Sequence, residues 1–201
     1  MEYYTESELK KVFIHEVGHF TANLILFEEI GQYKPKGINI TWDTKNQVLT
    51  GAVQAKNRTD MKPVKYYFNA VLYDFESVIS TIYGCIFQSI LFNLDDFTNC
   101  TSTLDGSSDY SFYKFAVHNY YLDISVIDGI LQKHYEELKK TELRQKLLNF
   151  DLDYFFKETP FSLEYFISYD DLTKYEELIT IKNIVKPLML ITYNELKPPH
   201  N

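Results

Sequence analysis

The hydrophobic positions of the first 31 residues follow the repeat of an amphipathic helix. Apolar side chains recur there every three or four residues, at Leu9, Val12, Phe13, Val17, Phe20, Leu24 and Phe27. Thr5 and Glu8 have the S/T-x-x-E spacing of a capping box. Gly31 is a residue type that commonly follows the last turn of a helix. The pattern therefore predicts a buried helix of about seven turns between Thr5 and Gly31.

Two shorter segments alternate between apolar and polar residues, as strands with one buried face do. Residues 37–42 place Ile38, Ile40 and Trp42 on one side, and residues 48–54 alternate less regularly. The four residues between them, 44–47, are typical of a turn. The sequence therefore predicts a small β-hairpin, which either shields the helices or offers its edge to an extended peptide.

Most of the remaining chain has helical patterning. Residues 78–94 predict a buried core helix, because polar residues interrupt them and acidic residues flank them, unlike a membrane span. Residues 66–74 are expected either to begin this helix or to form a separate one. Further helices are expected over 110–121, 124–149, 163–166 and 171–192, with Pro187 kinking or ending the last one. Residues 150–175 are rich in Tyr and Phe, which indicates an aromatic core or, alternatively, a docking surface for a protein partner.

Composition narrows the class of protein. The 201 residues carry a net charge of -8 and no basic cluster, which argues against a nucleic-acid partner. Cys85 and Cys100 are the only cysteines and make no disulfide framework. The first residues are acidic and lack the basic start and apolar core of a signal peptide. We expect a cytoplasmic protein without a stable membrane span.

Residues 15–19 read H-E-x-x-H in the middle of the first predicted helix. Positions i and i+4 lie on one face of a helix, so His15 and His19 can bind one ion through their imidazole nitrogens. Glu16 lies beside this pair and can take a proton from a water molecule on the metal. The alternative is that both histidines are ordinary buried residues. The motif predicts a catalytic Zn²⁺ site.

A catalytic zinc has three protein ligands, so a third must come from another segment. The longer H-E-x-x-H-x-x-G-x-x-H form is excluded, because Ala22 and Ile25 occupy its last two positions. Glu28 and Glu29 lie too far along the same helix to reach the ion. The remaining candidates are Glu76, Asp95, Asp96, Asp105, Asp109, His118 and His134.

The chain resembles the zinc metalloprotease domain of FtsH-type proteases and its stand-alone relatives. The resemblance rests on H-E-V-G-H-F at residues 15–20, the predicted hairpin, residues 80–88, and D-G-S-S-D at 105–109. It covers about residues 8–120 and implies Asp109 as the third zinc ligand. It also implies a zincin-like fold, which we expect to be α+β and mainly α-helical. We expect this metalloprotease domain over residues 1–122 and a helical C-terminal extension, packed on the same core, over 123–201.

Several positions depart from the family pattern. Val17 and Phe20 replace two alanines, and Cys85 and Gln88 stand where the family tends to have Arg and Glu. The 201 residues contain no G-x-x-x-x-G-K-[ST] loop, so the ATPase that feeds substrate to FtsH is not among them.

Asp109 is also favoured by its local sequence. The turn-rich run 105–108 precedes a helix-compatible run over 110–121, which would place Asp109 in a first helical turn. A carboxylate there is favoured by the helix dipole. On these grounds alone, Asp109 or Ser108 could equally be a helix N-cap. His118 and His134 are expected to be surface or partly buried structural residues.

The sequence thus predicts a zinc metalloendopeptidase with ligands His15, His19 and Asp109 and with Glu16 as the general base. Its substrates would be peptides or unfolded proteins, delivered by a partner where an ATPase is needed. One alternative is a catalytically inactive protease-like module that binds a protein partner or forms a homo-oligomer. Another is a zinc hydrolase that acts on a non-peptide amide.

Overall fold

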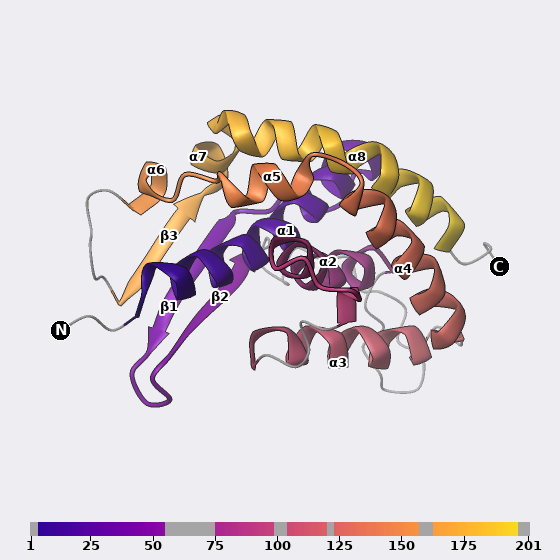
Figure 1. Ribbon diagram of the computed structural model, residues 1–201, viewed down its shortest axis with the longest axis horizontal. Helices are drawn as coiled ribbons and strands as arrows, with labels where there is room; N and C mark the ends of the chain where they lie inside the picture. The colour runs from indigo at the N-terminus through magenta and orange to yellow at the C-terminus, as the bar shows by residue number, and fades with distance from the viewer. Residues whose placement is uncertain (1–3, 55–74, 99–103, 120–122, 157–162, 197–201) are drawn as a thin grey trace.

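The computed structural model describes residues 4–54, 75–98, 104–119, 123–156 and 163–196, which form a mainly helical α+β fold (Figure 1). This confirms the predicted fold class. In chain order the elements are α1 (Glu6–Ile30), β1 (Gly37–Asp43), β2 (Val48–Gln54), α2 (Phe75–Leu91), α3 (Leu104–Asn119), α4 (Ile124–Lys139), α5 (Leu143–Leu148), α6 (Asp153–Phe156), β3 (Glu164–Ser168), α7 (Tyr169–Lys174) and α8 (Glu176–Leu196).

Helix α1 forms the centre of the core, as its apolar repeat predicts. The capping box is present: the Glu8 N–H donates to Thr5 Oγ1 at 3.2 Å, and the Thr5 N–H donates to Glu8 Oε2 at 2.7 Å. Gly31 ends the helix in the left-handed conformation, with φ of 77°. Between these caps most side chains of the helix are buried. Helix α2 packs against α1, and α8 crosses the other side of α1 (Figure 1).

The predicted hairpin belongs to a three-stranded antiparallel sheet with the order β2-β1-β3. Strand β3 comes from the C-terminal segment, where a helix was expected over 163–166, so that prediction was wrong. Tyr165 and Ile167 are buried while Glu164 and Phe166 are exposed. This alternation fits one face of a strand, and the segment is too short for its sequence alone to distinguish strand from helix.

Two further predictions concern the long helices of the C-terminal half. The single helix expected over 124–149 is interrupted after α4, because the Thr141 hydroxyl donates to Leu138 O at 2.6 Å and accepts the Leu143 N–H at 3.2 Å. Pro187 lies inside α8, which continues to Leu196, so the proline does not end this helix.

In the described part of residues 150–175, several of the aromatic side chains form the predicted core, while Tyr154 and Phe166 are exposed. Phe150, Phe155 and Phe156 surround the fully buried ring of Phe13, with ring centroids 5.2–5.9 Å from it. Tyr175 packs edge-on against Phe150 at 5.0 Å. The C-terminal third therefore packs on the same core as α1.

Cys85 is buried in α2 and is disulfide-bonded, contrary to the prediction that the cysteines make no disulfide framework. Cys100 and the helix expected over 66–74 lie outside the described residues. In the part of the chain that is described, no helix is long and apolar enough to cross a membrane. The cellular compartment stays a prediction.

Candidate metal centre

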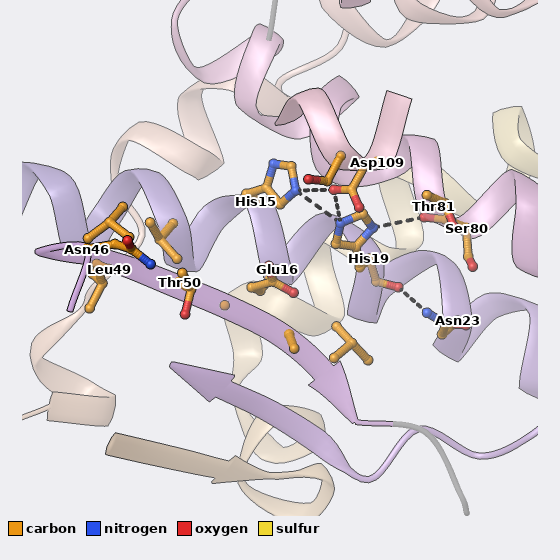
Figure 2. Close-up of a pocket in the computed structure, with 16 residues that line it drawn as sticks. His15, Glu16, His19, Asn23, Asn46, Leu49, Thr50, Ser80, Thr81 and Asp109 are labelled. Atoms are coloured by element: carbon orange, nitrogen blue, oxygen red, sulfur yellow. Dashed lines mark hydrogen bonds and ion pairs between the residues drawn. The ribbon is translucent and has the colours of Figure 1, made fainter. Parts of the chain in front are cut away.

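The three side chains expected to bind zinc meet at one point between α1 and α3 (Figure 2). His15 and His19 lie one turn apart on α1, with their Nε2 atoms 3.0 Å from each other. Oδ2 of Asp109, on α3, lies 2.7 Å from Nε2 of His15 and 3.1 Å from Nε2 of His19. Asp109 is 90 or more positions from the two histidines in sequence, and the three side chains nevertheless bring their metal-binding atoms to one point.

The second nitrogen of each imidazole is held by α2. His19 Nδ1 lies 3.0 Å from the carbonyl oxygen of Ser80, which can only accept a hydrogen bond. His15 Nδ1 lies 3.3 Å from Oε1 of Gln88, whose side chain is 1% exposed. Both rings thus donate from Nδ1 in their neutral forms, which leaves an unprotonated lone pair on each Nε2.

This donor set fits a metal ion. With both rings in these neutral tautomers, two Nε2 lone pairs and a carboxylate oxygen converge, an arrangement that is repulsive unless a metal ion or a proton is shared among them. Zinc bonds of about 2.0–2.1 Å at tetrahedral angles separate ligand atoms by about 3.3 Å, close to the 2.7–3.1 Å found here. His15, His19 and Asp109 could therefore hold zinc and leave one position open.

Two glycines allow α1 and α2 to approach this closely. Gly18 lies on α1 between His15 and His19 in sequence, and it faces the α2 backbone. A Cβ atom on it would lie 2.9 Å from the carbonyl carbon of Tyr83, so only a glycine fits at this position. A Cβ atom on Gly84 would lie 2.5 Å from His15 Nε2 and would also meet His19 Nε2. The α2 backbone thus forms one wall of the metal centre.

Glu16 lies between the histidine pair and strand β2. One of its oxygens is within 4.8 Å of both histidine ligand atoms. The side chain is 5% exposed, it accepts the backbone N–H of Val53, and its Oε2 has no hydrogen-bond partner among the described residues. Burial raises the pKa of this carboxyl, and the nearby histidines only partly offset that effect.

His19 and Asp109 each favour the charged form of the other. Burial by itself would lower the pKa of His19, but the hydrogen bond to Asp109 and the charges of Glu16 and Asp109 raise it to about 9. Burial would likewise raise the pKa of Asp109, yet the hydrogen bonds from His15 and His19 hold it well below its usual range. In the absence of metal, a proton on the imidazole thus supplies the positive charge that a metal ion would otherwise supply.

The metal centre opens into a cleft of about 740 Å³ between α1, β2, α2 and α3. Strand β2 passes over Glu16 (Figure 2). Gly51 makes this possible, because a Cβ atom there would lie 2.7 Å from Glu16 Oε1. The lining residues are Val12, His15, Glu16, His19, Asn23, Asn46, Val48, Leu49, Thr50, Gly51, Ala52, Val53, Ser80, Thr81, Ser108 and Asp109.

Asp109 lies farther inside its helix than the sequence predicts. Helix α3 begins at Leu104 rather than near residue 110, so Asp109 is in its second turn and is not the N-cap. The run 105–108 has the composition of a turn, and it is helical in the structure. Of the two roles considered for Asp109, only the contact with the histidines is observed.

The other candidate ligands whose side chains the structure describes do not reach this centre. His134 is buried and hydrogen-bonds to Tyr83 at 2.7 Å and to Thr192 at 3.0 Å. His118 is exposed on α3. Asp96 caps a turn by accepting the Thr98 N–H at 2.6 Å. The structure does not describe the side chains of Glu76 and Asp105.

Sequence reasoning missed the parts played by Ser80 and Gln88. Gln88 stood out only as a departure from the family pattern, and a backbone carbonyl such as that of Ser80 leaves no signal in sequence.

No protein-family model, curated protein or solved structure matches the chain. The resemblance to FtsH-type proteases therefore stays a prediction.

Proposed function

We propose that this protein is a zinc-dependent metallopeptidase. The observation that carries the proposal is the convergence of His15 Nε2, His19 Nε2 and Asp109 Oδ2 within 2.7–3.1 Å, with both Nδ1 atoms held by acceptors on α2. These three residues would hold the ion. Zinc, when bound, supplies a Lewis acid that polarises a carbonyl and lowers the pKa of water toward neutrality.

Glu16 is the general base of the proposed reaction. Its buried carboxylate has a raised pKa and an unpartnered Oε2, so it is a stronger base than a solvated carboxylate. It would take a proton from the attacking water and return it to the leaving amine. The Val53 N–H holds the carboxylate in place through the transfer.

Strand β2 would bind the peptide. Beside β1, the Trp42 N–H donates to Leu163 O, and Lys36 O accepts from the Tyr169 N–H. The backbone N–H and C=O groups of even-numbered residues in β1 therefore face β3, and those of odd-numbered residues face β2. In β2, the backbone groups of Leu49, Gly51 and Val53 then point away from β1. No described strand pairs with that edge. An extended peptide added there would lie along the cleft beside the metal centre.

The test is hydrolysis of unfolded protein and quenched fluorescent peptides by wild type and Glu16→Gln, with bound zinc measured in the same samples. We expect Glu16→Gln to keep its zinc and lose activity by at least about 10²-fold. The matched control is Glu137→Gln, on the exposed side of α4, which should behave as wild type. Equal turnover in wild type and Glu16→Gln would remove the proposed base. Zinc binding without turnover on any peptide would favour the alternative of a partner-binding module.

A further inference from the structure

Helix α3 carries Asp109 to the histidine pair, and the helix itself has only a small apolar face. It packs against α2 and α4. Among its described side chains only Tyr113 and Val117 are buried, and the others are at least partly exposed. Apolar burial is not directional, so this face alone fixes the rotation of α3 about its own axis only weakly. The position of Asp109 therefore depends on a more directional contact.

Asp128 supplies such a contact from α4. Its Oδ1 accepts the hydroxyl of Tyr113 at 2.9 Å, and its Oδ2 accepts the hydroxyl of Tyr110 at 3.1 Å. The two phenol rings stack on each other, with their centroids 5.8 Å apart. Hydrogen bonds to a carboxylate are directional and about twice as strong as those between neutral groups. One carboxylate thus holds two side chains of α3, one with each oxygen.

Both tyrosines keep the protons that they donate. Burial, reinforced by the charge of Asp128, raises the pKa of Tyr110 to about 12. The same two causes raise the pKa of Tyr113, which is fully buried, well above its usual value. The two hydrogen bonds to Asp128 therefore persist across the neutral pH range.

The two tyrosines lie where they can control the direction of Asp109. Tyr110 is the next residue along α3, and Tyr113 lies four positions on, one turn away on the same face as Asp109. The end of a side chain lies about 5–6 Å from the helix axis, so a rotation of about 10° moves it by about 1 Å. A binding group has to be held within about 0.5 Å of its working position. A small rotation of α3 would therefore take Asp109 out of the metal centre.

We propose that Asp128 is a positioning residue: through the two tyrosines, it holds α3 in the rotation that presents Asp109 to the histidine pair. Asp128 does not line the cleft, and no residue of α4 does so. It acts on the metal centre from outside, by fixing the helix that carries the third ligand. This inference rests on the metal centre of the proposed function and does not depend on peptide hydrolysis.

The test is the zinc affinity of Asp128→Leu and Tyr113→Phe, measured by competition with a chelator. Leucine branches at the same carbon as aspartate but accepts no hydrogen bond, and phenylalanine lacks only the hydroxyl. We expect each variant to bind zinc about 10- to 100-fold more weakly, the usual effect of losing a contact behind a metal ligand. Tyr135→Phe is the matched control, because Tyr135 is also fully buried and donates to Leu94 O at 2.7 Å, without contacting α3. It should lose stability to thermal unfolding as Tyr113→Phe does, and keep wild-type zinc affinity.

An Asp109→Ala background separates positioning from a general loss of structure. With the third ligand gone, the rotation of α3 no longer affects the ion, so adding Asp128→Leu should change zinc affinity by less than about twofold. The visible spectrum of bound Co²⁺, which responds to the ligands and their geometry, gives a second comparison at full metal occupancy. Asp128→Leu should alter this spectrum, and Tyr135→Phe should not.

The outcomes distinguish this inference from the proposed function. Wild-type zinc affinity in Asp128→Leu, an equal loss of affinity in the Asp109→Ala background, or an unchanged Co²⁺ spectrum would overturn the positioning role. Zinc binding that responds to Asp128 as expected, in a protein that cleaves no peptide, would support the positioning role and overturn the peptidase function alone.

Discussion

Gly84→Ala tests the geometry of the metal centre with a single methyl group. The added Cβ atom would lie 2.5 Å from His15 Nε2 and 2.6 Å from His19 Cε1. Real Cβ contacts are essentially never under 3.0 Å, so one side of the contact must move. The rings cannot move freely, because Gln88 and Ser80 hold their Nδ1 atoms. Both anchors are on α2, the helix that carries Gly84.

The expected effect is a large loss of zinc affinity with little loss of fold. Disturbing one outer hydrogen bond of a metal-binding histidine costs about 10- to 100-fold in affinity. Because the methyl group displaces both rings, we expect a loss of at least about 100-fold, or about 2.8 kcal/mol. Alanine is favoured over glycine inside a helix by about 1 kcal/mol, which offsets part of the steric cost in the metal-free protein.

The assay is a competition titration of zinc against a chelator of known affinity, with thermal unfolding measured in parallel. Gly129→Ala is the matched control, because this glycine is also inside a helix and a Cβ atom there meets nothing within 4 Å. The control should keep its zinc affinity and gain about 0.5–1 kcal/mol of unfolding free energy. Wild-type zinc affinity in Gly84→Ala would refute the close approach of α2 to the two histidines.

Three further predictions concern separate parts of the site and core. Gly51→Ala puts a methyl group 2.7 Å from Glu16 Oε1 and should lower kcat by about 10- to 100-fold while zinc, measured by elemental analysis, is retained. Gln88→Leu removes the acceptor of His15 Nδ1–H and should weaken zinc binding by about 10- to 100-fold. Gln88→Glu should not weaken it, and equal affinities for the two variants would contradict this role. Burial lowers the pKa of His134 from 6.5 to about 4, so the folded state binds fewer protons than the unfolded state between these values. Denaturant unfolding should therefore show a loss of about 3 kcal/mol as the pH falls from 6.5 to 4, and His134→Gln should remove that contribution.

The sequence predicted α1 and the hairpin because their patterns are long and agree with local signals. The apolar repeat of α1 runs between a capping box and Gly31, and each of these features alone predicts the same helix. The hairpin combines two alternating segments with a turn. The contact of Asp109 with the histidines was expected from the family resemblance, since local sequence left ligand and cap equally open.

The remaining features depend on contacts between distant segments. Strand β3 pairs with β1 across more than 120 residues, and its five residues carry too short a pattern to be assigned alone. Gln88 and Ser80 reach His15 and His19 only because α2 packs on α1 at Gly18 and Gly84. The interruption after α4 comes from the Thr141 hydroxyl, which competes with the helical hydrogen bonds there.

The central claim is that His15, His19 and Asp109 hold one zinc ion. Its most direct test is the zinc content of wild type and His19→Ala after zinc reconstitution and dialysis against metal-free buffer, measured by elemental analysis. The proposed site predicts one zinc ion per wild-type chain and none in the variant. Wild-type protein that retains no zinc, or a variant that retains as much as wild type, would contradict the site.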